Sequence, residues 1–309
     1  MQRTAMSDDV PAIRLVHLAK RYGRVTALDD VSLDVQAGEI FGFLGVNGAG
    51  KTTTIRILLD LVRRNGGRAE VFGRDCHADG VAVRGGIGYL PSELGFYGDM
   101  TGEASLDLLA RLGPHPVDSA RRRALLDRLE LSATELRRRI RDYSTGMRRK
   151  LGLVQAFQAD PPLLILDEPT DGLDPLMQDA VYGLLADARQ RGRTVFMSSH
   201  VLPEVERVCD RLALLRRGRL VLVSPVADVR RMSARTVVVT FSETMPTPSA
   251  AWPEGCTAVA IAPTQWTLRV AGAMGPLMAR LSGLPIADVD VRETRLEDIL
   301  RHYYREETP

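Results

Sequence analysis

The sequence has 309 residues, enough for one large domain or two of ordinary size, and its 45% hydrophobic content allows a sizeable buried core. The formal net charge is only +2, so charge gives no reason to expect a nucleic-acid partner, and none is predicted. Cys76, Cys209 and Cys256 show no paired spacing, which argues against a disulfide framework and favours a reducing compartment.

The N-terminal residues and the apolar runs bear on membrane placement. Residues 1–11 lack the apolar stretch of a secretory signal, and we expect a disordered tail there. No window of the sequence approaches the roughly 18 consecutive apolar residues of a membrane-spanning helix. Any role at a membrane is therefore expected to come through a partner chain.

The first third of the chain favours strands followed by a helix. Apolar runs between turn residues predict strands at 12–18, 31–35 and 39–45. Apolar residues at helical spacing predict a helix over 51–64 that stops at Gly66–Gly67. A further strand is predicted at 87–91.

The middle of the chain alternates helices and strands. Helical periodicity predicts helices at 102–113, 117–131, 145–158, 176–192 and from residue 202. The continuous apolar run at 162–169 indicates a strand covered on both faces, another strand is predicted at 194–200, and residues 212–223 favour a hairpin turning at Arg217–Gly218. This alternation predicts an α/β domain over 12–228 with a mostly parallel sheet, interrupted by a helical subdomain at about 93–160.

The pattern changes after about residue 228. Short β-type runs at 236–241, 257–262, 266–270 and 287–291 accompany helical patterns at 275–283 and 296–304. Residues 229–309 are therefore expected to form a small, separate α+β domain.

The stretch "GVNGAGKTT" is the most informative motif. Gly45-x-x-x-x-Gly50-Lys51-Thr52 fits the phosphate-loop pattern between a strand and a helix, as the pattern requires. Its glycines let backbone N–H groups turn inward and form a concavity that binds anions, and the following helix adds its N-terminal partial positive charge. Lys51 can then reach the β- and γ-phosphates, and the Thr52 hydroxyl can ligate Mg²⁺. The remaining loop positions assigned to nucleotide binding are Asn47, Gly48, Ala49 and Thr53. The alternative, a glycine turn with an exposed lysine, does not explain the correct strand and helix flanks.

Two acids end the buried strand at 162–169. Asp167 is placed to join the Mg²⁺ shell, and Glu168 to orient and deprotonate an attacking water. His200 ends the next strand, where an imidazole that both donates and accepts can sense a γ-phosphate. The alternatives are a strand ending in solvated acids and a structural histidine; the phosphate loop upstream favours the functional interpretation.

A second anion site is expected at Ser144 and Gly146. The serine hydroxyl, free N–H groups and the N-terminus of the basic helix at 145–158 are suited to a phosphate. The alternative is that Ser144 is only an N-cap.

Together these motifs resemble the ATP-binding subunit of an ABC transporter, a P-loop NTPase, over residues 12 to about 228. "GVNGAGKT" is similar to its phosphate loop, "YSTGM" (with Thr145 and Met147) to its signature motif, "LLILDE" to its magnesium and base strand, and "GLD", ending at Asp174, to its D-loop. His200 matches the switch histidine, and Tyr22 stands where the family places an aromatic that stacks on adenine. The segments "IGYLPSELGFYGDMTGEASL" and "RLEDILRHYY" resemble the branch that exports drugs and antibiotics, in which daunorubicin-resistance proteins fall and a small C-terminal domain often follows.

Several positions depart from the family pattern. Val46 replaces a usual proline, and Asp171 adds a negative charge before the D-loop. Thr145 and Met147 replace the commoner glycine and glutamine of the signature. Ser92 stands where the family often has the Q-loop glutamine, and serine is too short for the same contact. Either Glu93 takes that role or the contact is lost.

The resemblance implies a mechanism. Two copies bind head to tail, so that Lys51 and Thr52 of one copy and Ser144 and Gly146 of the other enclose ATP and Mg²⁺. Glu168 is the expected general base, His200 the γ-phosphate sensor, and a separate integral membrane permease the partner, which places the chain at the cytoplasmic face of the cell membrane. Three alternatives stay open: a soluble ABC ATPase acting on DNA or ribosomes, a non-enzymatic regulatory protein with a degenerate nucleotide site, and an importer subunit. The transported substance is not encoded in these motifs.

Overall fold

The computed structural model describes residues 10–232, 234–246 and 252–292, which divide into two compact units. The first unit comprises residues up to 200 and 207–223, and the second comprises 201–206 and 224 onward. The expected tail at 1–11, apart from Val10 and Pro11, and the expected helix at 296–304 lie outside the described residues. The domain boundaries at residues 12, 228 and 229 stay predictions.

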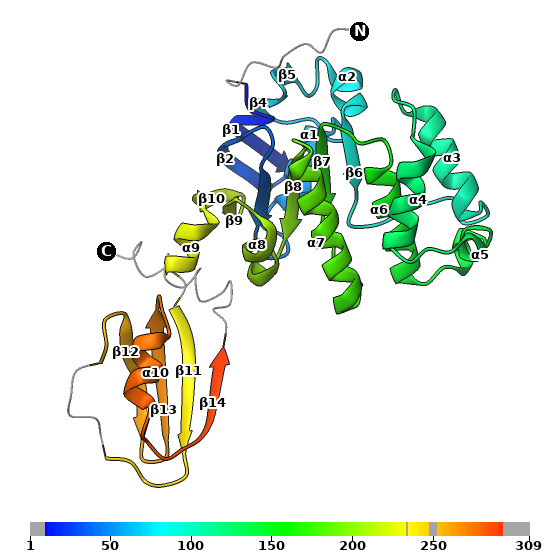
Figure 1. The fold of residues 1–309 in the computed structure, drawn as a ribbon. Helices are drawn as coiled ribbons and strands as arrows, with labels where there is room; N and C mark the ends of the chain where they lie inside the picture. The colour runs from blue at the N-terminus through cyan, green and yellow to red at the C-terminus, as the bar shows by residue number, and fades with distance from the viewer. Residues whose placement is uncertain (1–9, 233, 247–251, 293–309) are drawn as a thin grey trace. The chain divides into compact units, whose positions relative to one another are not determined.

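The first unit contains two sheets (Figure 1). An antiparallel sheet has the order β2-β1-β4-β5, and a six-stranded sheet has the order β10-β9-β3-β8-β7-β6. The strands are β1 (Ile13–Tyr22), β2 (Val25–Val35), β3 (Ile40–Leu44), β4 (Gly66–Val71), β5 (Arg74–Asp75), β6 (Ile87–Leu90), β7 (Leu163–Asp167), β8 (Thr194–Ser199), β9 (Arg211–Arg216) and β10 (Arg219–Pro225).

The strands β3, β7 and β8 form the middle of the six-stranded sheet. All their residues are buried, as expected for continuous apolar runs covered on both faces. They run parallel, with Leu44 opposite Ser199 and Asp167 opposite Ser198. The carboxyl ends of these strands therefore meet at one edge of the sheet.

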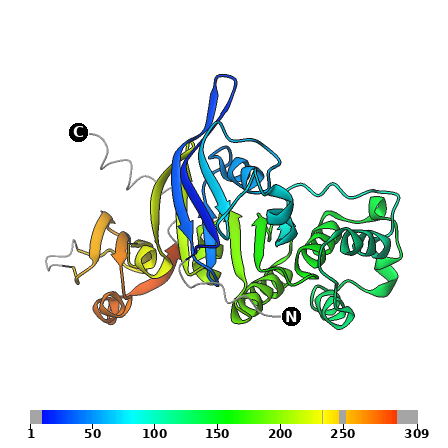
Figure 2. The ribbon, with the colours of Figure 1, turned by 90° about the horizontal axis from the view of Figure 1, so that it is seen from above.

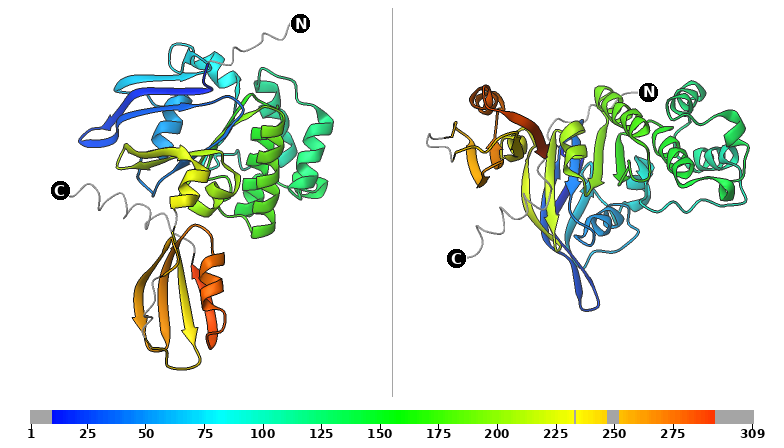
Figure 3. Two further views of the ribbon diagram at one scale, coloured as in Figure 1. Left: turned by 60° about the vertical axis from the view of Figure 1, so that its left-hand side comes forward. Right: turned by 90° about the horizontal axis from the view of Figure 1, so that it is seen from below.

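Helices connect and cover these strands. They are α1 (Lys51–Leu58), α2 (Gly80–Gly85), α3 (Gly102–Leu112), α4 (Ser119–Arg128), α5 (Ala133–Leu136), the 3-10 turn η1 (Ile140–Asp142), α6 (Thr145–Phe157), α7 (Pro175–Gln190) and α8 (Leu202–Val208), the last of which crosses the boundary between the units. Helix α1 contacts β2, β4 and β7 and so lies between the two sheets. Helices α3 to α6 lie together beside the sheets (Figure 3), and the expected bounds of a helical subdomain, about 93–160, stay a prediction.

Side-chain caps explain where most of the helical cluster begins. Thr101 accepts a hydrogen bond from Ala104 N at 3.2 Å, and Asp118 accepts one from Ala120 N at 2.9 Å. Ser132 and Glu135 form a reciprocal capping box at α5. These caps satisfy amide groups that the first helical turn leaves without partners.

Two expectations in the first unit were wrong in extent. The helix predicted over 51–64 ends at Leu58, because Asp60 adopts a positive φ of 54° and its carboxylate contacts the His77 ring at 2.8 Å. Gly66–Gly67 does not simply end a helix but begins β4, which pairs with β1. The hairpin turning at Arg217–Gly218 is confirmed by β9 and β10.

The second unit is an antiparallel sheet with helices. Its elements are α9 (Val226–Met232), β11 (Ala234–Phe241), β12 (Cys256–Ala262), β13 (Gln265–Ala271), α10 (Gly275–Leu281) and β14 (Ile286–Arg292), and the strand order is β12-β13-β11-β14. Alternate residues of β11 and β13 share an apolar core with Leu277 and Leu281 of α10. This alternation is the pattern of strands with one covered face.

Candidate nucleotide site

The phosphate loop joins β3 to α1. Gly50 precedes the helix with a φ of 113°, and a Cβ there would lie 2.6 Å from Ala27 O, so only glycine fits. At Gly45 an added Cβ would lie 2.5 Å from Leu215 O. Asn47 and Gly48 are exposed at the crest of the loop, while Ala49 is buried beneath it.

Lys51 lies under this loop with only 5% of its surface exposed. Its Nζ donates to Gly45 O at 2.5 Å and lies 3.2 Å from Glu168 Oε1. Thr52 and Thr53 follow in the first helical turn, whose N–H groups have no partner within the helix. The loop, the lysine and the helix start therefore form one cationic and N–H-rich centre.

Asp167 is buried at the end of β7 and accepts two hydroxyl hydrogen bonds. Thr52 Oγ1 donates to Oδ2 at 3.1 Å, and Ser198 Oγ donates to Oδ1. Burial, with a smaller contribution from the charge of Asp167, raises the pKa of Tyr89 to about 12, so this phenol stays protonated. A hydroxyl and a carboxylate side by side are the oxygen donors that Mg²⁺ prefers.

Glu168 connects Lys51 to His200. Its Oε2 lies 2.9 Å from His200 Nδ1, and its Oε1 is the atom paired with Lys51. Its backbone N donates to Ser198 Oγ at 3.1 Å, and its φ is 53°, a left-handed conformation that is uncommon for glutamate. The structure thus brings together Lys51, Thr52, Asp167, Glu168 and His200.

The signature residues lie at the start of α6. Ser144 is the N-cap and accepts from Met147 N at 3.2 Å, while Ser144 and Thr145 are exposed. A Cβ on Gly146 would lie 3.7 Å from Gly172 O, so the signature lies beside the D-loop of the same chain. Asp174 is the N-cap of α7 and accepts from Met177 N at 3.0 Å.

Two other predicted groups lie apart from this network. Tyr22 ends β1 in the β1–β2 hairpin, which projects beyond the rest of its sheet in Figure 2, and 44% of its surface is exposed. Lys20 Nζ lies 4.8 Å from the Tyr22 ring centroid. Ser92 and Glu93 are exposed after β6, and Ser92 is engaged through its backbone carbonyl.

Comparisons with known proteins agree on the family. The family model described as ABC transporter matches residues 28–171. The bacitracin transport ATP-binding protein BcrA of Bacillus licheniformis is 34% identical over 238 residues, which cover 75% of each chain. The daunorubicin resistance ATP-binding protein DrrA3 of Streptomyces coeruleorubidus is 39% identical over 212 residues, covering 68% of this chain and 67% of that one. The chain belongs to the ABC transporter family.

Solved structures show the same fold. A structure described as the ATP-binding subunit of an ABC transporter superposes with a TM-score of 0.66 at 30% identity, covering 72% of this chain and 92% of that one. The dimeric MJ0796 cassette has a TM-score of 0.63 at 20% identity, covering 69% of this chain and 98% of that one. The predicted P-loop fold and the predicted membership of the ABC transporter family are confirmed.

The length of the match differs among relatives. The chain spans 58% and 59% of two uncharacterised ATP-binding relatives, from Synechocystis and Nostoc.

Within residues 10–232, 234–246 and 252–292, no helix combines the length and apolarity that a bilayer crossing requires.

Sequence reasoning missed two residues of this candidate site. Ser198 bridges Asp167 and Glu168, and a fully buried Ser198–Ser199 pair at the end of an apolar strand was the available signal. Arg149 is 3% exposed and donates to Asp167 O and Glu168 O. No local pattern distinguishes Arg149 from its basic neighbours in the sequence.

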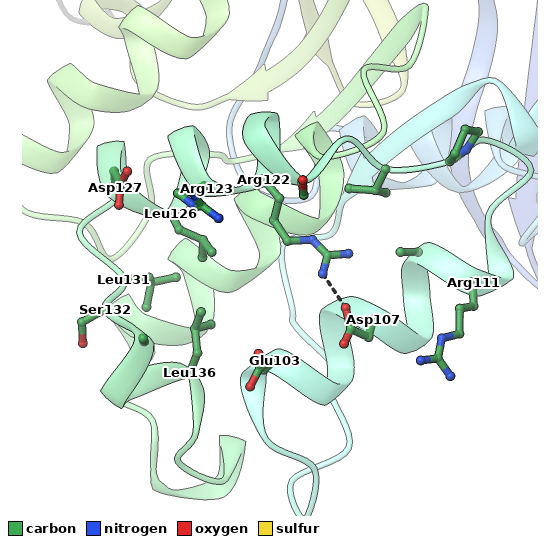
Figure 4. Close-up of a pocket in the computed structure, with 15 residues that line it drawn as sticks. Glu103, Asp107, Arg111, Arg122, Arg123, Leu126, Asp127, Leu131, Ser132 and Leu136 are labelled. Carbon is green, nitrogen blue, oxygen red and sulfur yellow. Dashed lines mark hydrogen bonds and ion pairs between the residues drawn. The ribbon is translucent and has the colours of Figure 1, made fainter.

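A pocket of about 850 Å³ lies in the helical cluster (Figure 4). Leu126, Leu131 and Leu136 line one side, and Glu103 on α3 faces them in the figure. The ion pair between Arg122 and Asp107 joins α4 to α3 beside these side chains. The pocket therefore combines an apolar wall with charges of both signs.

Proposed function

We propose that this chain binds and hydrolyses ATP as the motor subunit of an ABC exporter. The observation that carries the proposal is the position of the Glu168 carboxylate, 3.2 Å from Lys51 Nζ and 2.9 Å from His200 Nδ1, beside the Thr52–Asp167 pair. A carboxylate next to a phosphate-binding lysine and a magnesium-type donor set is suited to activating water against a γ-phosphate.

The roles of the residues follow from this geometry. Lys51 and the loop amides from Gly45 to Thr53 hold the phosphates of ATP. Thr52 and Asp167 fit Mg²⁺, which supplies positive charge against the phosphate oxygens when bound. As Lys51 turns toward phosphate, its pairing with Glu168 weakens, and the carboxylate becomes free to orient water and take its proton. His200, held by Glu168, senses the γ-phosphate.

The remaining site residues complete the nucleotide site in this proposal. Tyr22, exposed on its hairpin, stacks on adenine, and base–aromatic contacts of this kind contribute about 1–3 kcal/mol. Glu93 takes the Q-loop role, because the Ser92 side chain is short and its carbonyl is already bound by Arg149. Residues 12–228 act as the ATPase domain, and 229–309 as an accessory domain.

Two copies of the chain enclose two ATP molecules head to tail. Ser144, Thr145, Gly146 and Met147 of one copy cover the γ-phosphate held by the other, and Asp174 lies at the same interface. The exposure of Ser144 and Thr145 at a helix N-terminus supports this arrangement. The MJ0796 cassette, which shares the fold, is dimeric.

The closing and separation of the two copies act on a separate integral membrane permease. We assign its contact to the pocket between α3, α4 and α5, where Glu103 and Arg123 have no ion-pair partner among the residues that the structure describes. The chain then lies at the cytoplasmic face of the membrane through this partner. Relatives named for bacitracin transport and daunorubicin resistance support an antibiotic, drug or lipid-like substrate and the outward direction.

Glu168→Gln tests the proposal in the purified full chain. Turnover of MgATP should fall about 100- to 10,000-fold, because the amide cannot accept the proton of water. ATP affinity should stay within threefold, and the variant with MgATP should elute as a dimer in size-exclusion chromatography. The exposed glutamate variant Glu130→Gln should behave as wild type.

Two outcomes would contradict the proposal. A wild-type turnover rate in Glu168→Gln removes this residue from the role of base. Failure of the variant to dimerise with MgATP, alone and with its co-purified membrane partner, removes the shared sites. Affinity purification from detergent-solubilised membranes should recover a polypeptide with several spanning helices; recovery of ribosomes or DNA instead would support a soluble ABC ATPase.

A further inference from the structure

Arg149 makes an unusual set of contacts within the first unit. Its guanidinium donates from Nη1 to Pro91 O at 2.9 Å and to Ser92 O at 3.3 Å. From Nη2 it donates to Asp167 O at 3.1 Å and to Glu168 O. One side chain on α6 thus binds four backbone carbonyls at the ends of two neighbouring strands, β6 and β7.

The burial of the charged Arg149 guanidinium requires a physical explanation. Only 3% of Arg149 is exposed, and burial lowers the pKa of its guanidinium, while the nearby carboxylates of Asp171, Asp167 and Glu168 oppose that shift. Buried ionic groups are often replaceable by apolar residues without loss of stability. Space filling alone therefore does not account for an arginine here.

The backbone of Glu168 supplies that explanation. Its φ of 53° lies in the left-handed region, which is unfavourable for residues other than glycine. Arg149 binds its carbonyl, and Ser198 binds its N–H at 3.1 Å through Oγ. Held from both sides, the residue keeps the conformation in which its carboxylate meets Lys51 and His200.

The position of Arg149 on α6 adds a second connection. The N-cap of the same helix is Ser144, the signature serine, five residues before Arg149 in the sequence. The helix also packs closely on β6, since a Cβ on Gly152 would lie 2.8 Å from Leu90 Cδ1. Arg149 thus joins the helix that carries the signature residues to both strand ends.

We propose that Arg149 is a positioning residue that couples the signature helix to the Q-loop at Ser92 and to the conformation of Glu168. The inference rests on the proposed function, since Arg149 acts through the base that function assigns. When the partner copy engages Ser144, the guanidinium carries the change of α6 to both strand ends at once. Hydrolysis then occurs only when the signature helix is seated.

Substitutions at Arg149 test this coupling in the full chain. Arg149→Met removes the donors at similar volume, and Arg149→Lys keeps the charge but cannot donate to both strand ends at once. The matched control is Arg148→Met, at the neighbouring arginine, whose Nη2 donates to Arg141 O at 3.2 Å. We expect kcat to fall at least 10-fold in Arg149→Met and at least threefold in Arg149→Lys, with ATP affinity within threefold. Arg148→Met should keep wild-type kcat.

A double-mutant cycle separates positioning from general structural damage. In single-turnover measurements with radiolabelled ATP, Arg149→Met should change the residual rate of Glu168→Gln by less than twofold, because its effect passes through Glu168. If Arg149→Met does not fold, Arg149→Lys takes its place in the cycle.

Each outcome bears on the inference in a defined way. Wild-type kcat in both Arg149 variants, an equal loss of rate in the Glu168→Gln background, or a loss of ATP affinity parallel to kcat overturns the role of Arg149 and leaves the proposed function standing. Absence of ATPase activity in the wild-type chain, with or without its membrane partner, overturns the proposed function, and the inference with it.

Discussion

The two compact units of the chain bury different kinds of side chain. Among the described residues of the first unit, the buried polar and charged side chains are Lys51, Thr54, Ser105, Arg149, Gln158, Asp167, Thr170, Thr194, Ser198 and Ser199. In the described part of the second unit the corresponding set is Ser224, at its boundary. The core of the second unit is built from apolar side chains such as Val239, Phe241 and Leu268.

This difference indicates where the chemistry lies. A buried polar group costs about 1–3 kcal/mol when it has no partner, so a fold selected for stability alone favours apolar cores. The second unit follows that rule. In the first unit Asp167 and Ser198 are buried at the carboxyl ends of the adjacent parallel strands β7 and β8, and Lys51 is buried at the start of α1. Each of the three side chains is hydrogen-bonded there. Under the proposed function, their burial serves nucleotide chemistry rather than stability.

Lys51→Ala is expected to have the largest effect on nucleotide binding. The change removes a buried ammonium that the phosphates would engage, and a hydrogen bond to a charged group contributes about 1.5–3 kcal/mol. The dissociation constant for ATP should therefore rise about 10- to 100-fold by isothermal titration calorimetry. Lys150→Ala, at a lysine outside the site, should stay within twofold. Unchanged affinity in Lys51→Ala would mean that the polar core of the first unit serves stability after all.

Ser144→Asp distinguishes a serine that only caps α6 from one that also contacts the nucleotide of the partner copy. Aspartate is as good an N-cap as serine, so the stability of α6 should be unchanged by circular dichroism melting. Its negative charge, however, would face the γ-phosphate of the partner copy, and like charges in contact cost several kcal/mol. We expect kcat to fall at least about 10-fold with unchanged ATP affinity. A normal kcat would leave Ser144 with the role of helix cap alone.

The parts of the site that lie within one local pattern could be predicted from the sequence. Glycine spacing defined the phosphate loop, because Gly50 needs a φ of 113° that other residues rarely adopt. The apolar runs of β7 and β8 placed Asp167, Glu168 and His200 at strand ends, and parallel strands bring their ends together. These predictions needed only periodicity and chain order.

The parts that depend on distant contacts could not be predicted. Helix α1 ends at Leu58 although the apolar spacing continues to Val62, because Asp60 is held by His77. Gly67, with a φ of 76°, resembles a turn residue, but an added Cβ there would lie 2.2 Å from His17 O of the neighbouring strand. Arg149 was indistinguishable from other arginines until the fold placed four carbonyls around it.

Leu268→Ala tests whether the apolar core of the second unit serves stability alone. Of these variants it has the smallest expected effect on activity. Leu268 is fully buried in the core of the second unit, and truncating such a leucine costs about 2–5 kcal/mol through lost contacts and a cavity. The unfolding midpoint by calorimetry should fall, whereas Thr267→Ala, on the other face of the same strand, should leave it nearly unchanged. Both variants should keep ATP affinity and kcat within twofold at 25 °C, because no side chain of this core belongs to the nucleotide site. A 10-fold loss of kcat in a folded Leu268→Ala protein would show that the second unit takes part in turnover, and its apolar core would then carry a functional constraint as well as stability.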